Sequence, residues 1–464
     1  MRFAIIGAGL AGLTAAYEIH KADPTAQIDV LEAGERIGGK LFTVPFASGP
    51  TDIGAEAFLA ARSDAVEFFT ELGLADSLVS PSAAKSQYFA GGALHAFPAG
   101  GVMGIPSNPP AGAQDTAFDW TPGQDISVGA LVRRQYGDEI VDTVVSSLLG
   151  GVYSSTADDL GVRASVPALA AALDQLAEAG EPVTLSTAVK AVEAQREAAK
   201  TTSETRPVFQ TFKGGYAELY EALAEQCGAD IHLDSFVSAI TKDGEGFAIK
   251  GGGEGTYDKV ILAVPAPTAA VLLRDLAPAA APHLRAIKLA SSAVVGMRFD
   301  SSEGLPDNSG VLVAVNEPGI TAKAFTFSSK KWPHLEARGG ALVRASFGRL
   351  GDEASARMDE DLLVDAALDD LLTITGFDGR AAGLGEIFVQ RWFGGLPAYG
   401  VDHIATVSAA RAEIAAVPGV EAIGAWAGEW EFPQLSQMPR QQYTGCWDKH
   451  PKTLLTTPIA VESL

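Results

Sequence analysis

The sequence has little cysteine and little histidine, and it has no long apolar run. Its two cysteines, Cys227 and Cys446, form no CxxC pair and no disulfide framework, so we expect a reducing, cytoplasmic environment. The seven histidines are scattered without an HxH or HxxxH pair, so we expect no metal site. No stretch offers about 18 uncharged apolar residues, so we expect no transmembrane helix.

Positive charge is also scarce. The 464 residues include 34 Lys and Arg against 57 Asp and Glu, which gives a formal net charge of −23. This balance argues against binding to nucleic acid or to anionic lipid, because both would repel the chain. The length suffices for two domains with full cores. The chain begins directly with an expected strand, which we take to leave no room for a signal peptide.

Glycine, by contrast, is abundant, with 50 residues, and three of them form a pattern near the start. Ala4 to Ile6 suit a buried parallel strand. Gly7, Gly9 and Gly12 follow as GxGxxG at the opening of a helix. Glycines there permit a tight turn, backbone approach to a pyrophosphate and close packing of helix on strand. The N-terminus of that helix offers N–H groups to the same pyrophosphate.

A second expected strand, Ile28 to Leu31, ends at Glu32. Glu32 stands about 20 residues after the last glycine, the spacing at which a carboxylate meets the ribose hydroxyls of a dinucleotide. One GxGxxG is weak evidence, but here strand, helix, strand and acid follow in register. We therefore predict a dinucleotide-binding unit, and the alternative is a glycine-rich turn without a ligand.

The residues after Glu32 sharpen this prediction. ERIGGKL, with Arg36, Gly38 and Gly39, resembles the flavoprotein family that includes amine oxidases, phytoene desaturases and protoporphyrinogen oxidases. The resemblance implies non-covalently bound FAD with these residues beside its diphosphate, whereas a solvated turn is the alternative. It also implies an α/β fold, with a Rossmann-like FAD-binding domain of the GR2 flavoprotein type and an interleaved α+β substrate domain.

Further segments resemble FAD contacts of that family. DIGAEAF, which begins at Asp52, resembles the segment under the isoalloxazine ring, where Gly54 lets the backbone approach; a hairpin end is the alternative. Val237 matches the position whose backbone binds adenine, or it is an ordinary core valine. By this resemblance the cofactor-binding residues are Gly7, Gly9, Leu10, Ala11, Gly12, Glu32, Ala33, Arg36, Gly38, Gly39, Lys40, Gly54, Ala55, Glu56, Val237, Ala263, Trp392, Gly424 and Ala427.

Three more segments narrow the family. FPAGGVMGIPSNP, with Met103 to Pro106, resembles the LPxGxxMGIP segment of bacterial HemY-type porphyrinogen oxidases. GGVYSSTADDL, with Asp158 and Leu160, resembles their GVYAGDPxxLS motif, and VQRWFGGLPAYGVDH resembles their RWxxxxPQY segment, with Ala398 where Gln is usual. The resemblance implies a place in heme biosynthesis and a six-electron oxidation of coproporphyrinogen III to coproporphyrin III. Oxidation of protoporphyrinogen IX is the alternative.

In such an oxidase the cofactor performs the difficult chemistry. The resemblance implies hydride transfer from a meso carbon to flavin N5, with O2 as the acceptor and H2O2 as a product, so we predict no catalytic side chain. Coproporphyrinogen III carries four carboxylates, which Arg or Lys can pair. The candidate substrate-binding residues are Arg62, Lys85, Arg391 and Tyr399, and each can equally be an ordinary surface or core residue. We expect a monomer or homodimer and a transient contact with the next heme-pathway enzyme.

The resemblance also implies that the two domains alternate along the chain. We predict the FAD-binding domain from residues 1–85, 207–285 and 386–464, and the substrate domain from 86–206 and 286–385. Periodicity and capping residues predict helices over Ile126–Leu149 (capped by Ser127 and divided at Gly137), Pro167–Glu178, Tyr216–Leu223, Asp359–Leu372 and Ile404–Ala416. We expect hairpins over 41–54 and 87–97, and strands over 231–240, 246–249, 257–264, 293–299, 310–315 and 341–347.

The C-terminal tail departs from the family. The family continues with a terminal helix that faces the flavin, but Pro433, Pro439, Pro451 and Pro458 forbid one long helix here. The tail is either a true variation or the result of a frame change. Alternatives to the oxidase are therefore a non-catalytic porphyrin-binding protein, a damaged homologue, or a flavin amine oxidase, although the MGIP and GVY segments argue against the last.

Overall fold

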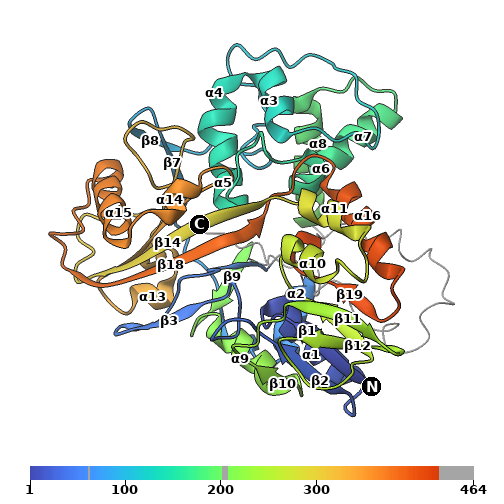
Figure 1. Cartoon of the computed structure of the whole chain (residues 1–464). Helices are drawn as coiled ribbons and strands as arrows, with labels where there is room; N and C mark the ends of the chain where they lie inside the picture. Colours follow the sequence, from blue (N-terminus) through green and yellow to red (C-terminus); the bar gives the residue numbers. More distant parts are fainter. Residues whose placement is uncertain (61–62, 201–206, 428–464) are drawn as a thin grey trace.

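The computed structural model describes residues 1–60, 63–200 and 207–427 of the chain. Figure 1 shows a parallel sheet below, two long strands across the middle and a group of helices above. The predicted residue Arg62, the proline-rich tail and Cys446 lie outside the described residues.

The sheet that holds the glycine motif has five strands, all paired in parallel, in the order β10-β2-β1-β13-β19. These strands are β1 (Arg2–Ile6), β2 (Gln27–Leu31), β10 (Asp230–His232), β13 (Lys259–Leu262) and β19 (Val420–Ala422). The strands come from three distant parts of the chain, yet each buries apolar residues, as parallel strands require. The predicted strand 231–240 was wrong in its middle, because the chain turns at Asp234, whose φ is 53°.

Helices cover both faces of this sheet. Phe3 and Ile5 of β1 pack in one core with α1 and α9, whereas Ala4 and Ile6 pack in a second core with α10, α11 and α16. Alternate residues of a strand point to opposite faces, so one strand serves both cores. The helices are α1 (Leu10–Ala22), α9 (Ala217–Gln226), α10 (Ala266–Leu272), α11 (Ala280–Ala286) and α16 (His403–Ala415). The predicted helices in the α9 and α16 regions are confirmed.

A second sheet has seven strands in the order β18-β14-β17-β16-β15-β7-β8. They are β7 (Gln87–Ala90), β8 (Ala93–Ala96), β14 (Leu289–Phe299), β15 (Gly310–Val313), β16 (Ala324–Thr326), β17 (Ala341–Phe347) and β18 (Leu384–Pro397). The predicted strands at β14, β15 and β17 and the hairpin at β7 and β8 are confirmed. No strand was predicted at β18, which pairs antiparallel with β14 along most of its length (Figure 1).

The second sheet also has two covered faces. On one face α15 (Glu360–Thr375) packs on Val295 and Phe299 of β14. On the other face Val294 and Leu342 contact the hairpin of β3 (Thr43–Phe46) and β4 (Gly49–Asp52), together with Ile53. This second contact brings the predicted flavin segment at Gly54 against the sheet.

A group of helices forms the upper part of Figure 1. It comprises α3 (Val128–Tyr136), α4 (Asp138–Ile140), the π-helical turn η2 (Val141–Val145), α5 (Ser146–Tyr153), α6 (Val162–Ser165), α7 (Pro167–Glu178) and α8 (Leu185–Lys200). Ser127 caps α3 by accepting a hydrogen bond from the N–H of Ala130, and Gly137 ends it with a φ of 90°. The predicted cap, the division at Gly137 and helix α7 are therefore confirmed.

Short elements complete the described chain. They are β5 (Phe58–Leu59), α2 (Ser63–Glu71), η1 (Ala75–Ser77), β6 (Leu78–Val79), β9 (Phe209–Phe212), β11 (Ala239–Asp243), β12 (Gly246–Lys250), α12 (Ser328–Lys331), α13 (Pro333–Glu336), α14 (Glu353–Arg357) and η3 (Ala425–Ala427). The interleaved domain division stays a proposal. Because β18 belongs to the second sheet, we propose to move its last boundary from residue 386 to the end of β18.

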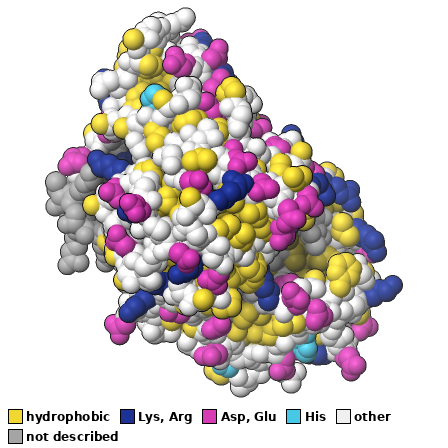
Figure 2. Space-filling model, turned by 90° about the vertical axis from the view of Figure 1, so that its left-hand side faces the viewer, with side chains coloured by type: hydrophobic (Ala, Val, Ile, Leu, Met, Phe, Trp, Pro, Cys, Tyr) yellow, Lys and Arg dark blue, Asp and Glu magenta, His cyan; other side chains and the backbone are white. Residues whose placement is uncertain are grey.

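The face that carries α15 is chemically mixed (Figure 2). Figure 2 shows side chains of both charges spread over this face, with hydrophobic side chains gathered between them. Among the described residues we find no helix that combines the length and the apolar character needed to cross a bilayer.

Candidate cofactor site

Predicted site residues meet at one edge of the five-stranded sheet. Gly7 follows β1, Glu32 follows β2, Ala263 follows β13, and Gly424 stands two residues after β19. Since these strands are parallel, their carboxyl ends share that edge. In open α/β sheets this is the edge where ligands bind.

The first glycine turn is packed too tightly for any side chain. A Cβ at Gly12 would lie 1.9 Å from the carbonyl oxygen of Gly7, and one at Gly7 would lie 2.6 Å from that of Ala263. Gly7 also has a φ of 105°, which favours glycine. Gly9 begins α1 without a side-chain cap, and the first helical turn, with Leu10 and Ala11, holds no acid. The positive end of α1 is therefore suited to an anion.

A second glycine turn lies against the first. The N–H of Gly38 donates to the carbonyl oxygen of Ala8 over 2.9 Å. A Cβ at Gly39 would come within 3.0 Å of the Cα of Gly9. The two turns thus form one glycine-walled surface, as close approach to a diphosphate requires.

Glu32 sits at the end of β2 with both carboxylate oxygens engaged. Its Oε2 accepts from the N–H of Ala8, and its Oε1 accepts from the N–H of Gly34, each over 2.8 Å. A carboxylate has about four acceptor sites. Glu32, next to Ala33, therefore keeps acceptor capacity for ribose hydroxyls while it holds the glycine turn.

The loop of residues 233–237 runs beside Glu32. The N–H of Ser235 donates to the carbonyl oxygen of Glu32 over 2.8 Å, and that of Asp234 donates to Gly34 over 3.0 Å. Val237 is 7% exposed and packs in the core between the sheet and α10. This places its backbone at the same end of the site as Glu32.

Arg36 stabilises the second glycine turn by hydrogen bonds to its backbone. Its guanidinium donates to the carbonyl oxygens of Ile37, Gly39 and Leu41 at 3.0, 2.7 and 3.1 Å. It also lies 3.9 Å from the centre of the Phe42 ring and 5.6 Å from that of Trp392. Burial lowers its pKa, with nearby acidic groups opposing the shift. Since a guanidinium has five N–H donors, two remain beyond these three bonds.

Lys40 and Gly54 lie together next to the turn that Arg36 stabilises. A Cβ at Gly54 would lie 2.1 Å from the carbonyl oxygen of Lys40, and the N–H of Ala55 donates to the same oxygen over 3.2 Å. Burial lowers the pKa of Lys40 to about 8. Within residues 1–60, 63–200 and 207–427 no carboxylate forms an ion pair with it. An anion bound here would raise this pKa again.

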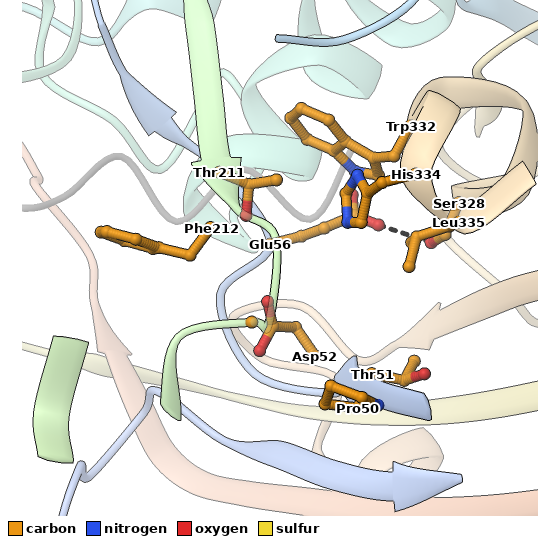
Figure 3. Close-up of a pocket in the computed structure, with 11 residues that line it drawn as sticks. Pro50, Thr51, Asp52, Glu56, Thr211, Phe212, Ser328, Trp332, His334 and Leu335 are labelled. Carbon is orange, nitrogen blue, oxygen red and sulfur yellow. Dashed lines mark hydrogen bonds between the residues drawn. The ribbon is translucent and has the colours of Figure 1, made fainter. Parts of the chain in front are cut away.

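Glu56 belongs to a buried ion-pair cluster rather than to an open surface. It is 3% exposed, accepts from Ser328, and lies 3.2 Å from the Nζ of Lys331 and 3.7 Å from an Nη of Arg344. Burial raises the pKa of this carboxyl, but the two cations outweigh burial, so its pKa lies below the usual value. Figure 3 shows Glu56 pointing toward Ser328. We therefore assign Glu56 to support of the turn at Gly54.

Tyr399 holds the last predicted cofactor segment. Its hydroxyl donates to the carbonyl oxygen of Ala425 over 2.6 Å, and its ring packs on His403. Trp426 donates from Nε1 to the carbonyl oxygen of Val264 over 3.0 Å. These contacts fix the segment from Gly424 to Ala427 against the strand end at β13. Tyr399 is 5% exposed, so the structure gives it a supporting position rather than a place on an open substrate surface.

The predicted substrate cations do not form one group. Lys85 is exposed just before β7, whereas Arg391 on β18 pairs with Glu360 and the carbonyl oxygen of Met358. β7 and β18 are five strand steps apart, which is about 24 Å at ~4.8 Å per step. They cannot hold the same carboxylate.

Sequence reasoning missed buried polar residues that support the site. Arg344 of β17 donates to the carbonyl oxygens of Gly54 and Ile53, and Lys331 of α12 pairs with Glu56. Nothing in the local pattern marks these residues, because their partners lie far away in the sequence.

The residues present fit a flavin dinucleotide. The two glycine turns pack backbone against backbone with no side chain between them, α1 offers its uncapped N-terminus, Glu32 keeps free acceptor sites, and Lys40 has no carboxylate partner among the described residues. This combination suits a group with both a diphosphate and a ribose.

Known proteins give an independent comparison. The model of the family described as flavin containing amine oxidoreductase matches residues 10–395. A protein of Mycobacterium tuberculosis named coproporphyrinogen III oxidase is 36% identical over 426 residues, which cover 88% of this chain and 90% of that protein. A protein of the same name from Bacillus subtilis is 27% identical over 445 residues, covering 91% of this chain and 92% of that protein.

Solved structures agree in fold. The crystal structure of a protein from Exiguobacterium sp. 255-15, assigned as a protoporphyrinogen oxidase, superposes with a TM-score of 0.77 at 28% identity. The match covers 91% of this chain and 93% of that chain. This likeness confirms the predicted fold class.

Proposed function

This chain belongs to the flavin-containing amine oxidoreductase family, and we propose that it is an FAD-dependent oxidase that converts coproporphyrinogen III to coproporphyrin III in heme biosynthesis. O2 is the electron acceptor and H2O2 a product. The observation that carries the proposal is the 36% identity, over 88% of this chain, to the Mycobacterium tuberculosis protein named for this reaction. The geometry at the edge of the five-stranded sheet supports it, because that site suits a flavin dinucleotide.

In this proposal FAD is held non-covalently by the two glycine turns. Gly9 and Gly39 bring backbone to the diphosphate, the N-terminus of α1 offers N–H groups, and Lys40 supplies the charge that burial otherwise disfavours. Glu32 takes the ribose, and the backbone at Val237 takes the adenine. Bound FAD would supply the two-electron acceptor for hydride removal from a meso carbon.

At the other end of the site the protein positions the ring system. Gly54 packs closely on the backbone of Lys40 and Phe42, where a Cβ would clash, and in this proposal the backbone at Gly54 lies under the flavin ring. Trp392, above Arg36, offers an apolar wall to a flat substrate. A strong general base is not required, because pyrrole N–H protons can leave to water.

Binding of four carboxylates by a chain of net charge −23 requires local cations. We keep Arg62, Lys85 and Arg391 as candidates for different propionates. The separation of Lys85 and Arg391 across the sheet rules out a shared subsite. We also propose a cytoplasmic location, a monomeric or dimeric state and a transient contact with the next enzyme of the pathway.

The second candidate substrate is protoporphyrinogen IX. The fold likeness to the Exiguobacterium protein assigned to that reaction favours it. The two substrates differ in how many carboxylates they carry, so cations at the site should decide between them.

The test begins with the visible spectrum of the purified protein. Coproporphyrinogen III is then added in air, and porphyrin fluorescence is followed beside a protein-free autoxidation control. We expect a flavin spectrum and a fluorescence rise above the control, with three H2O2 per porphyrin because six electrons leave in pairs. No rate above the control, even with added FAD, would refute the oxidase and favour a non-catalytic porphyrin-binding protein.

Substrate preference follows from a parallel assay. Equal concentrations of coproporphyrinogen III and protoporphyrinogen IX are compared by kcat/KM, at low and high salt. A preference for the coproporphyrinogen that shrinks as salt rises supports carboxylate pairing by cations. A preference for protoporphyrinogen IX would replace the first proposal with the second. Turnover of primary amines alone would point to a flavin amine oxidase.

A further inference from the structure

A small polar pocket lies beside the turn at Gly54. Three parts of the chain enclose it: the end of the first hairpin with Glu56, the end of β9 with Gly215, and the helices α12 and α13. Figure 3 draws its lining side chains, with the hydrogen bond from Ser328 to Glu56 dashed. The lining residues are Pro50, Thr51, Asp52, Glu56, Thr211, Phe212, Gly215, Ser328, Trp332, His334 and Leu335.

The size of the pocket limits its occupant. It has room for about one water molecule. A nucleotide, a porphyrin or any organic ligand is therefore too large. Its lining mixes carboxylates with neutral donors, so a lone anion is also disfavoured.

Several polar atoms at this pocket are buried without a partner. Thr211 Oγ1, Trp332 Nε1 and His334 Nδ1 form no hydrogen bond to any described residue. Trp332 is 0% exposed and Thr211 is 3% exposed. A buried polar group left unsatisfied costs about 1–3 kcal/mol, so three around one small space favour a bridging water.

Asp52 faces this pocket from the hairpin side. Its Oδ1 accepts from the hydroxyl of Thr43 and, over 3.0 Å, from the N–H of Tyr216. No cation of the described chain lies within ion-pair distance of it. Unlike Glu56, whose charge Lys331 and Arg344 offset, Asp52 can exist either as the acid or as the carboxylate.

The surrounding charges leave the acid and carboxylate forms of Asp52 close in free energy at neutral pH. Burial raises the pKa of Asp52 to about 7 and Glu56 acts in the same direction, while Thr43, the N–H of Tyr216 and Arg344 oppose them. Burial, with Arg338 nearby, lowers the pKa of His334 to about 4, so His334 is neutral at neutral pH. The ionisable groups that face Asp52 are Glu56, Tyr216, Lys331, His334, Arg338 and Arg344.

We propose that this pocket binds one water molecule and that Asp52 exchanges a proton with it. The pocket is then a proton-transfer site behind the turn at Gly54. In the exchange Asp52 releases or accepts one proton, the water carries it, and no electrons move. The role rests on the oxidase function proposed above. For every two electrons, the substrate loses one hydride and one proton, and one proton is taken up as O2 becomes H2O2.

The first test needs no activity. The C=O stretch of protonated carboxyl groups is followed by infrared spectroscopy between pH 5 and pH 9 in the wild type, in Asp52→Asn and in the surface control Asp365→Asn. We expect one band that disappears around pH 7 in the wild type and in the control, and that is absent from Asp52→Asn. A band that persists in Asp52→Asn, or no titrating band in the wild type, overturns the proposal.

The bound water is tested by shape-conserving changes. Thr211→Val and Trp332→Phe each remove one polar atom from the lining. With its water less well held, the ionised Asp52 is less solvated, so the midpoint of the infrared titration should rise in both variants. Unchanged midpoints in both overturn the water site. These variants keep the proposal testable even if Asp52→Asn fails to fold.

The link to turnover is tested last. Asp52→Asn should keep the flavin spectrum and KM, lose about tenfold or more in kcat, and lose the pH dependence of kcat near neutrality. An unchanged kcat and pH profile would remove Asp52 from the oxidase cycle. If the wild type itself shows no oxidase activity, the proposed function fails. The infrared result still decides whether the proton-transfer site exists.

Discussion

Arg344 of β17 donates a hydrogen bond from Nη2 to the carbonyl oxygen of Gly54 over 2.6 Å. The two residues are 290 positions apart. This bond ties the seven-stranded sheet to the turn proposed to lie under the flavin. A second bond, to the carbonyl oxygen of Ile53 at 3.3 Å, and the ion pair with Glu56 hold the guanidinium in place.

Loss of this guanidinium should destabilise the protein strongly. Arg344→Met leaves Glu56 with one of its two cations and two carbonyl oxygens without a donor, which costs about 3–5 kcal/mol. Chemical denaturation measures the loss. Arg357→Met removes an exposed arginine that pairs with Glu353 one helical turn away, and should cost about 0.5 kcal/mol or less. Equal losses in both variants would contradict a supporting role for Arg344.

A methyl group in the first glycine turn should abolish tight FAD binding. Gly12→Ala places a Cβ 1.9 Å from the carbonyl oxygen of Gly7, so the turn must shift. Overpacking of this kind costs about 1–3 kcal/mol, which corresponds to roughly a tenfold to hundredfold loss in FAD affinity. Flavin fluorescence titration measures it. Gly400→Ala, whose Cβ would meet nothing closer than 3.5 Å, is the matched control.

Stability should fall as pH rises toward 7 because of Asp52. Burial raises its folded-state pKa from 3.8 to about 7, so the folded protein retains a proton that the unfolded chain releases above pH 3.8. The stability that this proton provides is full below pH 3.8 and is lost as pH rises through about 7. Asp52→Asn should therefore be more stable than the wild type at pH 8, by on the order of 1–3 kcal/mol.

Urea unfolding at pH 5 and pH 8 measures this difference. The gain in Asp52→Asn should appear mainly at the higher pH, whereas Asp365→Asn, on the surface of α15, should show no such gain. A wild type whose stability rises between pH 5 and pH 8 in step with that of Asp52→Asn would refute the assignment.

Removal of one hydroxyl should loosen the last cofactor segment. Tyr399→Phe loses the hydrogen bond to the carbonyl oxygen of Ala425, worth about 1 kcal/mol. FAD retention on dilution should fall, measured by the flavin content after gel filtration. Thr373→Val, on α15, loses a 2.8 Å bond from its hydroxyl to the carbonyl oxygen of Asp369, far from that segment, and should retain FAD as the wild type does.

The parts that sequence predicted well are those built within about forty residues. Gly7, Gly12 and Glu32 follow from strand ends and from glycine positions, and the structure brings them to one edge of the sheet. The cap at Ser127 and the break at Gly137 also depend only on neighbours along the chain. Local sterics and hydrogen bonding decide such features, so the pattern alone predicts them.

The supporting residues could not be predicted in this way. Glu56, expected to face the cofactor, pairs with Lys331, 275 positions later. Arg391, expected to hold a propionate, pairs with Glu360. Both outcomes depend on how segments far apart in the sequence come together in space, a loop with α12 in the first case and β18 with α15 in the second, and periodicity carries no such information.

The sequence by itself therefore determined the α/β class, the glycine turns and the position of Glu32 at the end of a strand. Each depends on backbone geometry over a few neighbouring residues. Only the tertiary structure decided that Arg344 and Glu56 support Gly54, that Lys85 and Arg391 lie five strand steps apart in the second sheet, and that Asp52 lines a water-sized pocket. Those relationships arise from the register and order of the strands in the second sheet, because folding brings together charges that the chain keeps hundreds of residues apart.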